Sequence, residues 1–279
     1  MMLAPSLARA RCSDQERARW MVHQSLVMLL NPLGTEHNAR LGLCVPLYPS
    51  AERALNGNHL EVGASTYVAP IYALAGGFAQ ISPATFFIAR VELHAQAIWP
   101  LPLTGAGYYP RGGYEDAFSS ASTPADRGRS TTGWSLRLLG VLRGAIDLSP
   151  AVTLYAVDAF WLDYDEIGEA THWVDVRDDL IAARSDWIAA NEAVLLMGVR
   201  TPGPELRFGA YSTLRFVPAS GYGNHQVGPF AMIAWDRPDT HVASLAIFVR
   251  LGVYTHHAFR EAQLSTMLGA GVDWDLGGL

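Results

Sequence analysis

Charge is scarce in this sequence. Only 16% of its 279 residues are charged, whereas 50% are hydrophobic. An ordinary soluble domain carries about 25% charged residues, so this chain lacks many of the groups that keep a protein surface hydrated. It also lacks any uninterrupted apolar run of roughly 18 residues, which excludes a transmembrane helix. Two classes remain: a soluble all-β protein with a large core, and a protein whose apolar surface is spread over alternating strands that face lipid.

Basic residues and cysteines are also few. The net charge is −6 and the pI is about 5.8, which argues against the basic face that a nucleic-acid partner favours. The two cysteines, Cys12 and Cys44, are too few for a disulfide framework and lack metal-ligand spacing. We expect two free thiols, with a Cys12–Cys44 disulfide as the alternative.

What the chain does contain is side-chain alternation with period 2, which places successive residues on opposite faces of a strand. The clearest case is residues 84–99, where apolar residues occupy the odd positions and Arg90, Glu92 and His94 occupy even positions. Similar alternation occurs over residues 133–149, 206–217, 243–255 and 263–276, and weaker alternation over residues 20–31, 39–48, 59–68, 71–82, 152–164, 187–200 and 227–236.

These segments amount to about twelve strands. Reading residues 59–82 as one strand, instead of two divided at Ala69-Pro70, gives eleven. Because single-chain bacterial barrels use even strand numbers, we predict an all-β fold: an antiparallel up-and-down transmembrane β-barrel of about twelve strands. We assign residues 20–279 to this domain. Residues 1–19 form an N-terminal segment in which Ala8-Arg9-Ala10 has the form of a signal-peptidase site, and we interpret it as a signal-peptide remnant.

Short and long connections alternate between the predicted strands. Ser82-Pro83, Ser149-Pro150, Pro202-Gly203-Pro204 and Arg237-Pro238-Asp239 are typical of short turns. Residues 100–132 and 165–186 are long links, and the second has apolar residues at helical spacing between His172 and Arg184. We therefore expect a short amphipathic helix there. A barrel shows this alternation when one rim faces the periplasm and the other the exterior.

The two faces of the strands favour a membrane barrel over a soluble one. Trp and Tyr, which suit a lipid interface, recur towards strand ends at Trp20, Tyr48, Trp99, Trp134, Trp161, Trp187, Trp235, Tyr254 and Trp274. The polar faces are rich in arginine, whose planar guanidinium group cross-links carboxylates in a lumen. We expect a polar network in the lumen formed by Arg90, Glu92, His94, Arg137, Arg143, Asp147, Arg207, Arg215, Arg250 and Asp273.

Two similar turn sequences lie between alternating strands, Gln80-Ile81-Ser82-Pro83-Ala84 and Asp147-Leu148-Ser149-Pro150-Ala151. On this architecture the chain resembles the bacterial outer-membrane β-barrel proteins over about residues 20–279. The resemblance implies a bacterial outer-membrane location and contact with membrane lipid. One departure is the C-terminus: such proteins often end in an aromatic residue, whereas this chain ends in Trp274-Asp275-Leu276-Gly277-Gly278-Leu279.

No motif for a catalytic, cofactor or metal site stands out. His256 and His257 are the only adjacent histidines, and two histidines do not make a closed zinc site. The acidic groups Asp163-Asp165-Glu166 and Asp175-Asp178-Asp179 lack a full calcium loop, so we interpret them as solvated loops. We therefore expect no cofactor and no bound metal.

Three functional hypotheses remain open. The first is a porin-like barrel with a narrow or plugged passage for small polar solutes. The second is a structural or assembly barrel whose long loops, residues 100–132 and 165–186, bind a protein partner. The third is an outer-membrane lipid hydrolase in which His256 and Ser265 meet across the last hairpin; otherwise we expect no enzyme.

Overall fold

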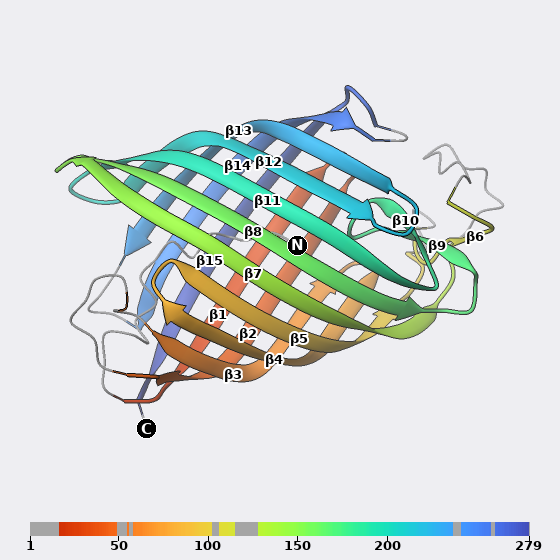
Figure 1. Ribbon diagram of the computed structural model, residues 1–279, viewed down its shortest axis with the longest axis horizontal. Coiled ribbons are helices and arrows are strands. Elements are labelled where there is room, and N and C mark those ends of the chain that lie inside the picture. Colours follow the sequence, from red (N-terminus) through yellow and green to blue (C-terminus); the bar gives the residue numbers. More distant parts are fainter. Residues whose placement is uncertain are drawn as a thin grey trace.

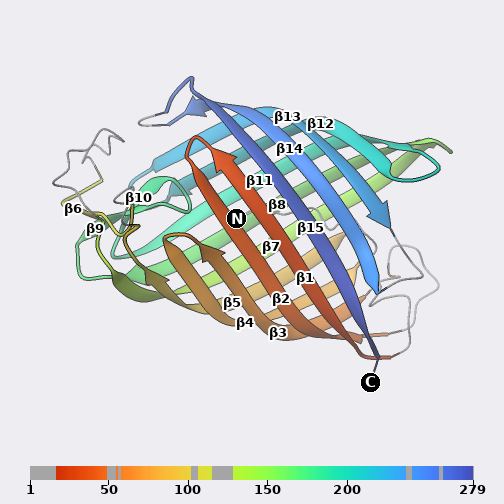
Figure 2. The same ribbon diagram turned by 180° about the vertical axis from the view of Figure 1, so that it is seen from behind.

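Twelve long antiparallel strands form a closed barrel in the computed structural model, which describes residues 17–48, 55, 58–101, 106–114, 128–236, 241–257 and 260–278. The barrel strands follow one another around the wall by antiparallel pairing, and β1 closes the ring by pairing with β15 (Figures 1 and 2). Their bounds are β1 Arg19–Leu30, β2 Gly34–Pro46, β3 His59–Ala69, β4 Tyr72–Ala84, β5 Phe87–Ile98, β7 Thr131–Ser149, β8 Val152–Ile167, β11 Ser185–Arg200, β12 Glu205–Val217, β13 Tyr222–Asp236, β14 Val242–His256 and β15 Leu264–Gly278.

The predicted strand number and fold class are confirmed. The chain does turn at Ala69-Pro70, so residues 59–82 belong to two strands, β3 and β4. The predicted signal-peptidase site and Cys12 lie outside the described residues. The described part of the chain contains no helix that is long and apolar enough to span a membrane.

The wall sorts its side chains into an apolar outer face and a largely polar inner face. Large apolar side chains that alternate outward are about half exposed, among them Leu93 at 56% and Leu195 at 54%. Inward positions of the same strands are buried and include Arg90, Glu92 and Glu192. An exterior of this kind is stable in hydrocarbon, because the closed ladder leaves no strand edge to satisfy.

Aromatic residues partly follow the prediction. Trp134, Tyr164 and Trp187 form a continuous outward group on three neighbouring strands, with ring centroids 5.2 Å apart in each pair. Trp161 and Tyr254, which the sequence suggested for the lipid interface, point into the barrel and are only 3% and 6% exposed. That expectation is wrong for these two residues, because each lies on the inward phase of its strand.

The two ends of the barrel differ. Both ends of the barrel domain, Arg19 and Gly278, lie at the rim that carries the predicted short turns, and that rim faces the periplasm in single-chain barrels. The opposite, exterior rim carries the two long links. Segments of these links form a small sheet of β6 (Pro110–Arg111), β9 (His172–Asp175) and β10 (Leu180–Ala183), in the order β10-β9-β6, which lies at one end of the barrel in Figure 1.

The prediction of a helix over residues 172–184 is wrong, because residues 172–183 form the β9–β10 hairpin. The backbone amides of Arg177 and Asp178 donate to Oδ1 of Asp175, at 2.8 and 3.2 Å. Asp179 has a φ of 55°, which is left-handed. Such local side-chain bonds favour a turn over a helix. We call residues 172–183 the cap hairpin.

Apolar side chains from most of the inner wall also meet in the lumen. Val157, Leu196, Phe230, Phe248 and Met267 belong to one buried cluster that includes inward residues of β1, β5, β7, β8 and β11–β15. A second buried cluster joins the exterior ends of the strands to the cap hairpin through residues such as Tyr72 and Trp173. The lumen therefore contains an apolar layer as well as ionic groups.

Candidate functional site: the charged lumen and its cap

A layer of ion pairs lies in the lumen towards the exterior mouth. Arg137 on β7 and Asp163 on β8 are each 3% exposed, and the guanidinium group donates to both carboxylate oxygens, with Nε 2.5 Å from Oδ1. Two parallel hydrogen bonds between a guanidinium group and a carboxylate are shorter and stronger than hydrogen bonds between neutral groups. The pair links neighbouring strands and so stiffens the wall without crossing the lumen.

Arg90, Glu92 and His94 continue this layer on β5. Arg90 lies 3.2 Å from Glu92 and donates to Oε1 of Gln80 from Nε at 2.8 Å and from Nη2 at 2.6 Å. The hydroxyl of Tyr67 donates to Glu92 at 2.7 Å. His94 is hydrogen-bonded to Ser65 at 2.7 Å. Arg90 and Glu92 therefore belong to one hydrogen-bonded network, and His94 contacts it through its ring, which lies edge-on to that of Tyr67 with the centroids 5.3 Å apart.

Arg250 and Glu192 form a separate pair within the apolar layer. Two hydrogen bonds of 2.9 and 2.5 Å join them, although β14 and β11 are separated by two other strands. The Arg250 guanidinium lies 4.8 Å from the ring centroid of Tyr211 and 5.0 Å from that of Phe230. The pair therefore links two non-adjacent strands inside an aromatic environment, where burial is costly unless both charges stay paired.

Asp273 lies at the junction of the first and last strands. Its carboxylate is 2.8 Å from Nδ1 of His23 and accepts a hydrogen bond of 2.7 Å from Ser244. The other ring nitrogen of His23 lies 3.1 Å from Glu61 on β3. This chain of contacts connects four strands near the point where the barrel closes.

The remaining predicted residues lie elsewhere. Arg207 pairs with Glu205 at 2.6 Å near the periplasmic end of β12. Arg143 donates to the Thr85 carbonyl at 2.8 Å. Asp147 pairs with Arg200 at 2.7 Å with both side chains more than 40% exposed, so this pair lies at the wet rim instead of in the lumen.

The exterior mouth is covered by the cap hairpin, whose turn reaches two distant parts of the wall. Nε of Arg177 lies 3.4 Å from Glu36 on β2, and Oδ1 of Asp178 lies 3.0 Å from Nε of Arg215 on β12. Four strands separate β2 from β12 on one side of the ring and six on the other. Arg215 is thus the predicted residue that joins the wall to the cap.

A third carboxylate completes the attachment. Asp179 lies 2.9 Å from His257 and 2.8 Å from Arg260, both at the exterior end of the β14–β15 hairpin. Asn224 on β13 donates to the Asp178 carbonyl at 2.9 Å. Within the described residues, β9 and β10 form no ladder with a barrel strand. Apart from backbone hydrogen bonds at its base, such as that from the Ile167 amide to the Arg184 carbonyl at 3.0 Å, the cap is held against the wall by side chains.

Charge on the cap carboxylates depends on burial and on these partners. Burial opposes the ionisation of Asp178, but the positive charges of Arg215, Arg177 and Arg137 act together to lower its pKa. The pKa of Asp179 is likewise lowered, against burial, by hydrogen bonds from His257 and Arg260. Asp175 differs: burial and the nearby Asp178 carboxylate raise its pKa well above the usual aspartate range.

The sequence pattern did not indicate most of the carboxylate partners of these arginines. Asp163, Asp165, Asp175 and Asp178 are each at most 6% exposed, so their interpretation as solvated loops is wrong. Asp163 and Asp165 lie on β8, which extends three residues beyond the predicted end at Tyr164. The signal for Asp163 was available, because continued alternation places it on the inward phase with Trp161.

Two further expectations fail on geometry. Cys44 is disulfide-bonded instead of free. Ser265 pairs with Gly252, four residues along β14 from His256, which corresponds to about 13 Å of strand. The register therefore does not bring together the two residues of the proposed lipid hydrolase.

The closed twelve-stranded wall, with its apolar exterior and charged interior, defines a transmembrane β-barrel of the bacterial outer-membrane kind. No protein-family model matches the chain, and no curated protein matches it. Its fold is similar to the β domain of the Bordetella autotransporter Brka, at 12% identity and a TM-score of 0.45, covering 92% of this chain and 99% of that chain. It is also similar to the NanC porin (7% identity, TM-score 0.38, 91% and 100% covered) and to OprD from Pseudomonas aeruginosa (9%, 0.31, 95% and 96%).

Proposed function

We propose that this protein is an outer-membrane channel for small polar solutes, whose exterior mouth is closed in the present state by the cap hairpin. The observation that carries the proposal is how the cap is held. Its turn bridges β2 and β12 through the Arg177–Glu36 and Asp178–Arg215 contacts, without a ladder to the described wall. A segment attached mainly by side chains separates from the wall at far lower cost than a strand does.

The hydrogen-bonding groups in the lumen below the cap are suited to the passage of a polar solute. Among the described residues, Nε and Nη1 of Arg40 have no hydrogen-bond partner, and this guanidinium belongs to the inward phase of β2. The carboxylates of Glu61 and Glu92 lie on the same side of the ring, on β3 and β5. Donors and acceptors that line one passage exchange readily with the hydration shell of a small polar molecule.

Conductance in planar bilayers tests the proposal. Residues 173–182 are replaced by a short Gly/Ser linker, while the control carries the same kind of linker in place of the periplasmic turn at 202–204. We expect rare or small openings for the wild type and the control, and stable, larger steps for the variant without the cap. Equal silence in all three would contradict a gated channel.

A sealed structural barrel is the second candidate, because the apolar cluster draws inward side chains from most strands and occupies part of the lumen. In that case removal of the cap leaves the bilayer silent, and the long links at 100–132 and 165–186 are the surfaces for a protein partner. Co-purification with and without the cap then distinguishes a partner-binding barrel from an isolated one.

A further inference from the structure

The lipid-facing wall contains a charged group far from either rim. Asp158 alternates outward on β8, six residues from Tyr164 of the exterior aromatic group. At about 3.3 Å per residue and a tilt near 40°, this separation is roughly 15 Å, about the middle of a 25 Å apolar band. Glu166 is the other charged side chain on the outward phase of the described strands, and it lies at the rim, 3.2 Å from Nε1 of Trp134.

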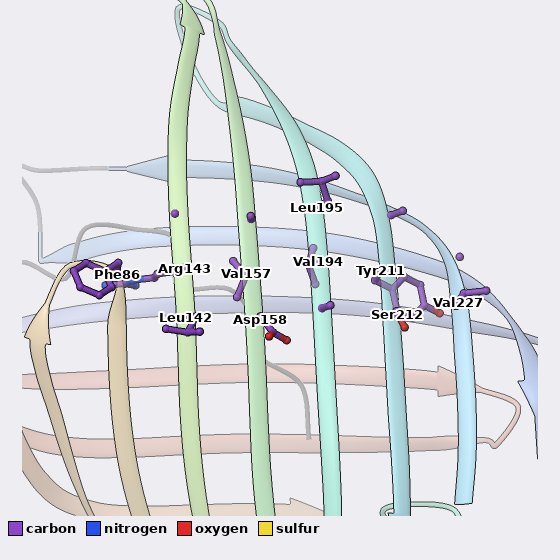
Figure 3. Close-up of a pocket in the computed structure, with 15 residues that line it drawn as sticks. Phe86, Leu142, Arg143, Val157, Asp158, Val194, Leu195, Tyr211, Ser212 and Val227 are labelled. Carbon is purple, nitrogen blue, oxygen red and sulfur yellow. The ribbon is translucent and has the colours of Figure 1, made fainter. Parts of the chain in front are cut away.

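Asp158 borders a hollow of about 960 Å³ in the outer wall, shown in Figure 3. Two outward rows of residues define it. One row runs through Leu142, Asp158, Ala193, Ser212 and Val227, and the other through Gly144, Ala156, Leu195 and Ala210. Because Gly144, Ala156, Ala193 and Ala210 have little or no side chain, the backbone forms much of the floor.

The hollow has the form of a narrow trough. The two rows are two residues apart along each strand, or about 6.6 Å, and the first row crosses five strands, or about 19 Å. Leu142, Leu195 and Phe86 are its bulkier borders, each roughly half exposed. A trough of this width accepts a single extended hydrocarbon chain and is too narrow for a β-strand or helix of a partner protein.

Polar groups around the trough are already paired, with one exception. Asn191 donates to Oδ1 of Asp158 at 2.6 Å. Nε2 of His225 is 3.0 Å from Ser212, and its Nδ1 is 2.5 Å from Thr255. Among the described residues, Oδ2 of Asp158 has no hydrogen-bond partner, so the wall presents one strong acceptor to the membrane interior. An unpaired carboxylate in hydrocarbon is costly unless a donor meets it.

The trough also rises towards the exterior. Val227 lies five residues from the exterior end of β13 at Tyr222, whereas Asp158 lies nine residues from the exterior end of β8 at Ile167. The paired His225 and Thr255 lie still closer to that rim. An outer-leaflet lipid with its headgroup near these residues would therefore lay one acyl chain along the trough towards Asp158.

From the trough and the unpaired acceptor, we propose that this wall binds an outer-leaflet lipid that has a hydroxylated acyl chain. The chain fills the apolar trough, and its hydroxyl donates to Oδ2 of Asp158. A carboxylate acceptor strengthens such a bond relative to a neutral one. The proposal does not depend on channel activity, because every residue that carries it faces outward.

The test compares two phospholipids that are identical except for one hydroxyl group on an acyl chain. Purified barrel is exchanged into detergent with an equal mixture of the two, and native mass spectrometry counts the lipid retained. We expect the wild type to prefer the hydroxylated lipid by about tenfold, the ratio expected for one charge-assisted hydrogen bond. Asp158→Leu should lose the preference, whereas Asp158→Asn, which keeps an acceptor oxygen, should keep part of it.

Two further variants test whether lipid is retained in the trough or anywhere on the outer wall. Ala193→Phe fills the trough and should reduce retention of both lipids, whereas Ala75→Phe, outward on β4, should behave like the wild type. Gel mobility of unheated samples confirms that each variant is folded. Equal retention of the two lipids by the wild type would overturn the proposal, as would unchanged binding in Ala193→Phe. Dimers that depend on Asp158 would overturn it in favour of a second copy of this chain.

Discussion

The exterior and periplasmic ends of this barrel use the same chemistry in opposite surroundings. At the exterior end, Arg137–Asp163 and the cap contacts are buried, and the cap covers the mouth. At the periplasmic end, Arg200 and Asp147 form a pair that is 49% and 41% exposed. Burial raises the cost of breaking a pair, because the charge left behind is not hydrated. An Arg–Asp pair therefore stabilises the fold at the exterior end, whereas a pair of the same kind contributes little to stability at the periplasmic end.

Removal of one buried charge should have the largest effect on stability. Arg250 and Glu192 are 2% and 1% exposed, so Glu192→Ala leaves an uncompensated guanidinium group among aromatic rings. We expect a loss of about 3–5 kcal/mol in the free energy of unfolding, measured by urea titration in lipid vesicles. The double variant Arg250→Met/Glu192→Leu should recover most of this loss. A single variant as stable as the wild type would contradict the assignment of a buried pair.

The contact between cap and wall should come next. Arg215→Ala removes the partner of Asp178 on β12 while leaving the Arg177–Glu36 contact intact. We expect the cap to detach more often, seen as a severalfold rise in open probability in single-channel recordings. Arg207→Ala, on the same strand but remote from the cap, is the matched control and should not change gating. Equal behaviour of the two variants would mean that the Asp178–Arg215 contact does not hold the cap closed.

The pH dependence of the cap should be smaller and has a definite sign. Burial raises the pKa of Asp175 above that of the exposed residue, so the docked cap favours its neutral form. The docked state therefore loses stability as pH rises from the ordinary aspartate pKa towards the raised value of about 7, so open probability should increase between roughly pH 4 and pH 7 and then level off. The lowered pKa values of Asp178 and Asp179 place their contributions outside this window, because these are lost only as pH falls into the acid range. Asp175→Asn should give a flat profile.

The smallest effect should follow Asp147→Ala at the periplasmic rim. The pair is exposed and screened by solvent, so we expect a change within about 1 kcal/mol in the same urea titration. A loss comparable to that of Glu192→Ala would remove the distinction between the two ends.

The strands were predictable from sequence because period-2 alternation is a local signal. Twelve strands, the turn at Ala69-Pro70 and the inward phase of Arg137 and Arg250 all follow from it. The same alternation also places Asp158 on the apolar face, but only the closed barrel shows that this face is turned towards lipid.

The cap and the ion pairs were not predictable in the same way. The apolar residues of 172–184 have helical spacing, but the Asp175 side chain accepts a backbone hydrogen bond that stabilises a turn. Apolar spacing does not predict that turn. Pairing of Arg250 with Glu192 depends on the curvature of the ring, since two strands separate them. Side-chain phase predicts which face a residue lies on, whereas its partner depends on register and closure.

The junction of β1 with β15 has a consequence for biogenesis. These strands pair over twelve positions, from Arg19 with Gly278 to Leu30 with Thr266, so residues about 250 apart in sequence must meet. Contacts at such separation form late and slowly. Until Leu264–Gly278 arrives, the free edge of β1 is open to pairing with any other strand. A chaperone or insertion machinery that shields this edge would therefore control the yield of folded protein more than the stability of the finished wall does.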